Sequence, residues 1–112
     1  MLVKENIHKE KDGSIGYYET IYDSSNILTS TYFPKTNILF IAFNKGSVYS
    51  YGNISSEIFE NFKNSESQGK FFIKEIKNNP NKYPFLKEFK LFESEINDAK
   101  KIIKEWKELN QQ

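Results

Sequence analysis

The sequence contains no cysteine and no arginine, and it has a single histidine, His8. Without cysteine there is neither a disulfide framework nor thiol chemistry. Without arginine there is no guanidinium fork for bidentate contact with guanine or phosphate. Any contact with nucleic acid must therefore use lysine, backbone N–H groups, side-chain amides and aromatic rings. All sixteen basic residues are lysines, and asparagine and isoleucine are abundant. This usage indicates an AT-rich coding genome, such as that of a low-GC bacterium or its phage.

Signals for catalysis, metal binding and membrane insertion are also lacking. His8 stands in a charged segment, where a lone histidine is more often a solvated surface residue than a base or a ligand. Asp and Glu show no metal-ligand spacing, and no phosphate-binding loop is present. No apolar run approaches the roughly 20 residues of a membrane helix, and the charged start does not resemble a signal peptide. We predict a cytoplasmic, non-enzymatic protein without a metal or cofactor, and not bound to a membrane.

The patterns that are present predict one α+β domain over residues 1–112. β-branched and aromatic residues favour three antiparallel strands, at residues 26–34, Ile38–Phe43 and Ser47–Tyr51. Residues 1–23 form an N-terminal extension in which residues 17–23 have a strand-like composition. Residues 2–8 could pair with them as a hairpin and add edge strands, so the meander has three to five strands. Two short helices follow, with Ser55 and Ser67 as N-caps, and the second runs from about residue 68 to 77. A long amphipathic helix is predicted over residues 86–112.

The register of the central hairpin decides where two tyrosines lie. Tyr49 and Tyr51 are one residue apart and share a face of their strand. A three-residue loop at 44–46 places them opposite Ile41 and Leu39, whereas a two-residue loop shifts the partners by one residue. Gly46 favours the longer loop, whose third position needs positive φ. The sequence leaves both registers open, and a slip of one residue changes which face the rings occupy.

The middle of the chain resembles a known family. The residues that carry the resemblance are "SSNI" at 24–27, Tyr32, the L-x-I-x-F of Leu39, Ile41 and Phe43, the Y-x-Y of Tyr49 and Tyr51, "SQGKFF" at 67–72 and "KYPF" at 82–85. In this order and spacing they are similar to the KTSC domain, a module found alone in bacterial and phage proteins and at the C-terminus of some lysyl-tRNA synthetases. The KTSC-like core spans residues 24–85. The family usually has proline where Ile54 and Ser55 stand here. The resemblance implies the fold, and its synthetase context suggests RNA binding.

Two groups of residues are candidates for ligand binding. Tyr49 and Tyr51 could form a stacking platform, although sheet aromatics more often pack a core. Ser67, Gly69 and Lys70 at a predicted helix start could attract an anion, although a plain N-cap is the commoner explanation. Residues 63–87 carry six Lys and two Glu, which gives +4, with aromatic rings between them; Lys74 and Tyr83 are included in the candidate surface. A solvated lysine-rich face is again the commoner explanation.

The end of the chain supports a second hypothesis. Apolar residues recur at spacings of four and three from Phe85 to Trp106, which is a heptad seam. The seam could dock on the sheet or pair with a second copy, and we expect part of each. The residues predicted for self-association are Phe92, Ile96, Ile103 and Trp106. The sequence therefore predicts a binding module for nucleic acid (RNA) or a nucleotide, of the kind that a phage-encoded accessory or counter-defence protein would use. The alternative is a protein–protein or homodimer module acting through the C-terminal helix.

Overall fold

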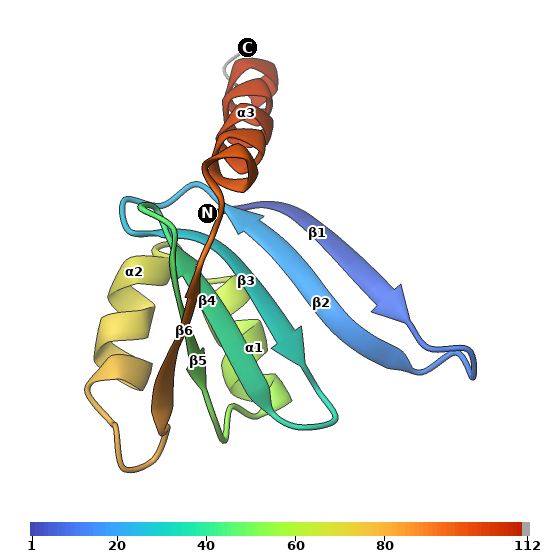
Figure 1. Cartoon of the computed structure of the whole chain (residues 1–112), viewed down its shortest axis with the longest axis vertical. Helices are drawn as coiled ribbons and strands as arrows, with labels where there is room; N and C mark the ends of the chain where they lie inside the picture. The colour runs from blue at the N-terminus through green and yellow to red at the C-terminus, as the bar shows by residue number, and fades with distance from the viewer. Residues whose placement is uncertain (111–112) are drawn as a thin grey trace.

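The computed structural model describes residues 1–110; residues 111 and 112, which the predicted C-terminal helix includes, lie outside the described range. Six strands form one antiparallel sheet in the order β1-β2-β3-β4-β5-β6, so each strand pairs with its neighbour in sequence order (Figure 1). The α+β class and the antiparallel meander are confirmed, but the strand count exceeds the predicted three to five. The strands are β1 (Leu2–Lys9), β2 (Ile15–Tyr22), β3 (Ile27–Phe33), β4 (Ile38–Phe43), β5 (Ser47–Tyr51) and β6 (Phe85–Lys90).

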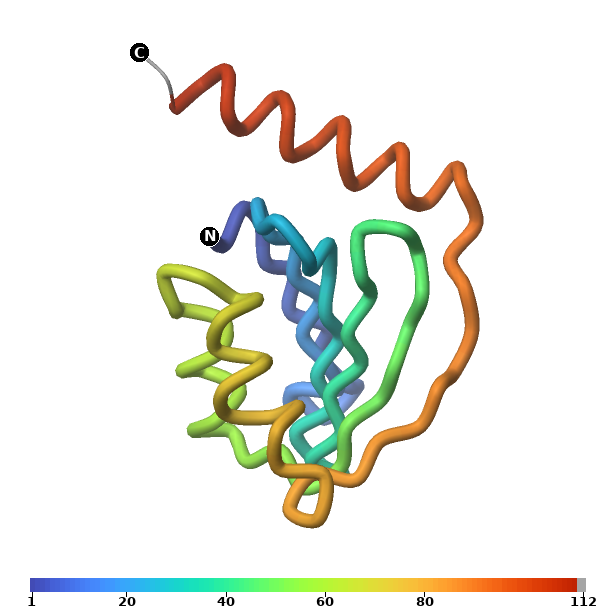
Figure 2. The backbone as a smooth tube through the Cα atoms, turned by 90° about the vertical axis from the view of Figure 1, so that its left-hand side faces the viewer, coloured from blue at the N-terminus to red at the C-terminus, as the bar shows by residue number. Residues whose placement is uncertain are grey.

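The hydrophobic core lies between one face of the sheet and the central helices. These are α1 (Ser56–Lys63), α2 (Gln68–Phe71) and the π-helix η1 (Phe72–Lys77), which continues directly from α2. Figure 2 shows this helical layer on one side of the sheet, with the C-terminal helix α3 (Glu93–Asn110) crossing one end. The core joins inward-facing residues of β2 to β5 with the apolar stripe of the helices. Its members include Tyr22, Ile27, Tyr32, Leu39, Ile41, Tyr51, Ile54, Phe59, Phe62, Phe72, Ile76 and Tyr83.

Local sequence signals explain the central elements. Ile41 pairs with Tyr49 and Leu39 with Tyr51, so the three-residue loop is confirmed. Gly46 has φ of +100°, which a glycine adopts readily. The Ser55 and Ser67 side chains accept hydrogen bonds from backbone N–H groups in the first turns of α1 and α2, which confirms both N-caps.

The predicted helix over residues 86–112 is wrong in its first part. Residues Phe85–Lys90 are strand β6, which pairs with β5, and α3 begins only at Glu93. The open edge of β5 offers backbone partners that an isolated helix pattern does not reveal: the Gly52 N–H donates to the Pro84 carbonyl at 2.8 Å, and the Leu91 N–H donates to the Gly46 carbonyl at 2.8 Å. This long-range pairing overrides the local helical periodicity.

The start of α3 has its own local cause. The Glu95 carboxylate accepts a hydrogen bond from the Phe92 N–H at 2.9 Å, which is one half of a capping box. At 1.5 Å per residue, the 18 residues of α3 span about 27 Å. α3 contacts β2 and β3, its Ala99 is buried, and Lys107 pairs with Asp23 at 3.2 Å. Part of the predicted seam is therefore used for docking within the same chain.

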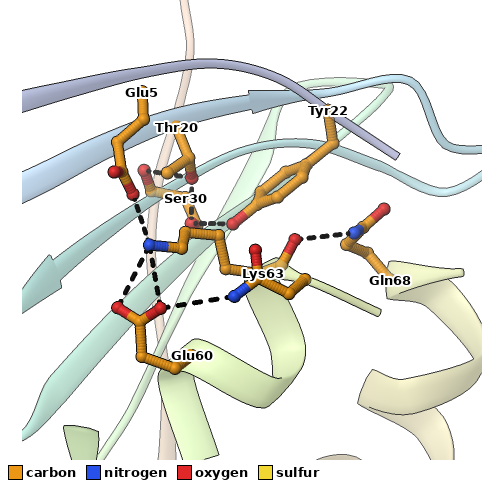
Figure 3. A network of polar contacts seen from close by, with 8 residues as sticks. Glu5, Thr20, Tyr22, Ser30, Glu60, Lys63 and Gln68 are labelled. Carbon is orange, nitrogen blue, oxygen red and sulfur yellow. Dashed lines mark hydrogen bonds and ion pairs between the residues drawn. The ribbon is translucent and has the colours of Figure 1, made fainter. Parts of the chain in front are cut away.

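A buried lysine ties the N-terminal extension to the helical layer. The Lys63 ammonium lies 2.8 Å from the Glu5 carboxylate of β1 and 3.0 Å from the Glu60 carboxylate of α1 (Figure 3). Burial lowers the pKa of Lys63, but the hydrogen bonds to Glu5 and Glu60 outweigh burial and raise this pKa above the usual 10.5. Lys63 thus remains charged inside the protein and does not belong to the exposed lysine surface predicted for residues 63–87.

An aromatic cleft as the candidate functional site

A cleft of about 750 Å³ opens between the β4–β5 hairpin and η1. Its volume lies within the range of roughly 300–1,000 Å³ that is typical of small-molecule sites. The walls come from the loop before β3, from β4 to β6, and from η1 with the segment that follows it. The lining residues are Ser25, Asn26, Phe43, Asn44, Lys45, Ser47, Tyr49, Tyr51, Phe72, Ile73, Ile76, Lys77, Pro80, Tyr83 and Phe85.

The sheet wall of the cleft follows from strand alternation. Tyr49 and Tyr51 project from β5 towards the helical layer, because their partners Ile41 and Leu39 are core residues. β6 places Phe85 opposite Tyr51. The Phe85 ring centroid lies 6.4 Å from that of Tyr49 and 6.3 Å from that of Tyr51. Three rings from two adjacent strands thus form one aromatic wall.

The opposite wall depends on the π-helical turn of η1. Hydrogen bonds in a π-helix join residues five apart, so residues four and five apart come to the same side. Phe72, Ile73, Ile76 and Lys77 show this spacing, and all four line the cleft. The ring of Phe72 packs edge-on against Tyr51, with centroids 5.2 Å apart, and closes the floor between the two walls.

Two hydrogen bonds bring the loop before β3 to the end of the cleft. The Asn44 N–H donates to the Asn26 carbonyl at 2.9 Å, and the Asn44 side-chain amide donates to the Ser24 carbonyl at 3.1 Å. A Cβ atom on Gly69 would lie 3.2 Å from the Asn26 side-chain nitrogen. A glycine at this position therefore lets α2 approach the loop closely.

The charge of the cleft has one sign. Lys45 on the hairpin and Lys77 on η1 are both exposed, and none of the lining residues found among residues 1–110 is Asp or Glu. Side-chain amides and hydroxyls supply the remaining polar groups. A concave surface with lysines and without carboxylates attracts anions.

The cleft tyrosines differ from Tyr22 and Tyr32 in their hydrogen bonds. The Tyr22 hydroxyl is 2.9 Å from the Ser30 hydroxyl, and the Tyr32 hydroxyl donates to the Ile54 carbonyl at 2.8 Å. Over residues 1–110, the hydroxyls of the cleft tyrosines, at positions 49, 51 and 83, have no hydrogen bond to protein and are not sealed from solvent. Burial raises the pKa of Tyr51 to about 12, so its hydroxyl keeps its proton and can donate.

The structure brings together only some of the predicted ligand-binding residues. Tyr49, Tyr51 and Tyr83 line the cleft, although Tyr51 and Tyr83 are also buried members of the core, as the simpler interpretation of the tyrosine pair expects. Ser67 is an N-cap and Gly69 is a packing residue. Neither of them lines the cleft, and neither do the exposed side chains of Lys70 and Lys74. A binding role for these four residues stays a prediction.

Sequence reasoning missed several residues of the cleft. Asn26, Lys45, Ile73, Lys77 and Phe85 come from four separate elements, and only the tertiary fold brings them to one site. The heptad spacing counts Phe85 as the first position of the C-terminal seam, whereas the structure places it in β6. The cluster of Lys near the aromatic residues of 71–85 was the one available signal for Lys77.

The predicted self-association residues divide into two groups. Ile96, Ile103 and Trp106 are half-buried, whereas Phe92 is exposed at the junction between β6 and α3. Ile96 reaches the hairpin, since a Cβ atom on Gly46 would lie 2.8 Å from the Ile96 Cδ1 atom. Self-association through these residues stays a prediction.

The described residues contain neither a metal-binding cluster nor a membrane-spanning helix. From residue 1 to residue 110, no group of three or more His, Asp or Glu side chains is arranged to hold a metal ion. Over the same range, no helix has the length and apolar character needed to cross a membrane.

The structure is that of a small α+β protein with an aromatic cleft of ligand size. Residues 23–83 match the family model of the KTSC domain, which is more than half of the chain, and the chain therefore belongs to the KTSC domain family. The crystal structure of a KTSC domain protein from Yersinia pestis is similar, with 30% sequence identity and a TM-score of 0.58. The similarity covers 63% of this chain and 96% of that chain. No curated protein matches the sequence significantly.

Proposed function

We propose that the protein is a non-catalytic module that binds single-stranded nucleic acid or a nucleotide in the aromatic cleft. The observation that carries the proposal is one acid-free cleft in which aromatic side chains and two lysines, Lys45 and Lys77, occur together. Stacking on aromatic rings and lysine contacts to phosphate are the two interactions that hold single strands without sequence preference. Such a module would suit a phage-encoded accessory protein that sequesters a nucleotide signal.

The test is the salt dependence of binding. Fluorescence anisotropy with a labelled single-stranded RNA of 12 nucleotides gives the affinity over a series of salt concentrations. If Lys45 and Lys77 each neutralise one phosphate, the slope of log K against log salt is about −1.4, at roughly 0.7 per contact in a single strand. Lys45→Ala and Lys77→Ala should each weaken binding and make the slope shallower by about 0.7.

Lys74→Ala is the matched control, because Lys74 is exposed on the same helix and does not line the cleft. It should leave both the affinity and the slope unchanged. Equal losses from Lys74→Ala and Lys77→Ala would mean that the strand follows a general lysine surface. The absence of binding to any single strand or nucleotide at low salt would refute the proposal.

Exposed apolar residues favour a second candidate function, a protein–protein or homodimer module at the C-terminal segment. Leu86, Phe89, Phe92 and Leu109 are all exposed, and the first three lie within seven consecutive residues. Sedimentation velocity over a range of concentrations tests self-association. Phe92→Ser and Leu109→Ser should shift a dimer to monomer without unfolding the chain, since both side chains are exposed. A sedimentation coefficient that stays monomeric at every concentration would exclude the homodimer.

A further inference from the structure

We infer that the cleft holds one nucleotide unit, with the ring stacked on Phe85 and Ile73 and its polar edge facing the tyrosine hydroxyls. This inference rests on the proposed function and specifies how the ligand is held. It also assigns a binding role to β6, which lies outside the family match at residues 23–83. The unit would be either a free nucleotide or one residue of a strand.

The two apolar residues identify where the ring lies. Phe85 is 54% exposed and Ile73 is 43% exposed, and both line the cleft, one from β6 and one from η1. Pro80 is also exposed, whereas the remaining apolar lining residues are buried or half-buried within the protein itself. A planar ring that covers Phe85 and Ile73 would remove the large exposed apolar area of the site from water.

The Phe85 ring is presented for stacking. Its tilted contacts with Tyr49 and Tyr51, at 46° and 33°, hold the ring in place from within the wall. More than half of the side chain remains open, so a ring on that open surface would make the kind of aromatic contact by which single-stranded bases are bound.

The polar groups identify the chemistry of the ligand. The cleft offers three tyrosine hydroxyls that have no hydrogen-bond partner in the described chain, two lysine ammonium groups and the side-chain amide of Asn26. Donors exceed acceptors, because the lining has no carboxylate. The complementary ligand therefore presents several acceptors together with a negative charge. A nucleoside phosphate does so, with carbonyl and ring-nitrogen acceptors on the base and oxygens on the phosphate.

The experiment compares free nucleotides with a strand. Isothermal titration calorimetry measures each of the four common nucleoside 5′-monophosphates, the corresponding nucleosides, and a 12-nucleotide single-stranded RNA. We expect at least one monophosphate to bind at one site, to compete with the RNA, and to bind more tightly than its nucleoside. Phe85→Ala should weaken binding by roughly 5- to 150-fold, the range that base–aromatic stacking contributes.

Two matched controls separate a site from a loss of folding. Phe89→Ala changes the same residue type in the same strand at 58% exposure, outside the cleft, and should alter binding less than about twofold. Tyr51→Phe removes only a cleft hydroxyl and should weaken binding by about tenfold, whereas Tyr22→Phe removes a hydroxyl of the core and should not. Circular dichroism verifies that each variant is folded.

Different outcomes of this experiment would refute the proposed function and the single-nucleotide site. If the RNA binds but no monophosphate binds or competes, and Phe85→Ala retains full affinity, the proposed function stands and the single-unit site is wrong. If the RNA fails to bind while a monophosphate binds, the site takes a free nucleotide and not part of a strand. If neither binds, the proposed function itself fails.

Discussion

Replacing Lys63 by methionine removes the buried ammonium and keeps most of the apolar stem. The Lys63 side chain is 9% exposed, that of Glu5 is 23% exposed and that of Glu60 is 47% exposed. Removing one partner of a fully buried pair costs about 3–5 kcal/mol, because the other charge is left without compensation. Glu5 retains some contact with water, so we expect a loss of about 2–3 kcal/mol in the free energy of unfolding.

The two carboxylates should differ in their contributions. Glu5→Gln should be clearly destabilising, because this carboxylate joins β1 to α1 in a partly buried place. Glu60→Gln should cost less than about 1 kcal/mol, as expected for an exposed pair within one helix. The double variant Glu5→Gln with Lys63→Met should recover part of the loss, since no unpaired charge then remains at this contact.

Urea unfolding at pH 7 measures these differences as changes in midpoint at constant slope. Hydrogen exchange of the β1 and β2 amides gives a local reading, and Lys63→Met should weaken protection there more than in β4. A loss of less than about 0.5 kcal/mol for Lys63→Met, the size of an ordinary surface substitution, would refute a structural role for the buried ion pair. Equal costs for Glu5→Gln and Glu60→Gln would also contradict it.

Three further predictions concern the hairpin, a buried tyrosine and a helix cap. Gly46→Ala should lower the free energy of unfolding by about 1–2 kcal/mol, because φ is +100°; thermal unfolding with no change in midpoint would contradict this. Burial raises the pKa of Tyr22 to about 12, so the folded state keeps this proton to a higher pH than the unfolded state does. The contribution of Tyr22 to the free energy of unfolding should therefore fall by up to about 3 kcal/mol between about pH 10 and 12. Tyr22→Phe should flatten that part of a pH series of urea midpoints. Ser67→Ala should cost about 1 kcal/mol through the lost cap, and an unchanged urea midpoint would contradict the capping contact.

The parts of the fold that could be predicted depend on local signals. Gly46 selects the hairpin loop and with it the partners of Tyr49 and Tyr51. Ser55 and Ser67 mark helix starts through contacts within three residues. Each of these contacts joins residues that are only a few positions apart, so a short stretch of sequence is enough to predict it.

The parts that could not be predicted depend on distant partners. Phe85 and Phe89 continue the helical spacing of α3, yet they lie in a strand because the open edge of β5 is available. Lys63 has the sequence context of a surface lysine, yet it is buried because β1, far away in sequence, supplies Glu5. Tyr49 and Tyr51 could be proposed from the sequence because they lie in one short strand. The second wall of the cleft, at η1, could not, because it meets these tyrosines only in the folded chain.

Both proposed binding modes require that the ligand enter the aromatic cleft. Chemical-shift mapping of ¹⁵N-labelled protein, titrated with a nucleoside monophosphate and then with a short single-stranded RNA, tests this requirement most directly. We expect saturable shifts concentrated at the amides of residues 43–51, 72–77, 83, 85 and 86, with both ligands moving the same set. Shifts that gather on α3 or on the β1–β2 hairpin, or no saturable shifts at all, would contradict it.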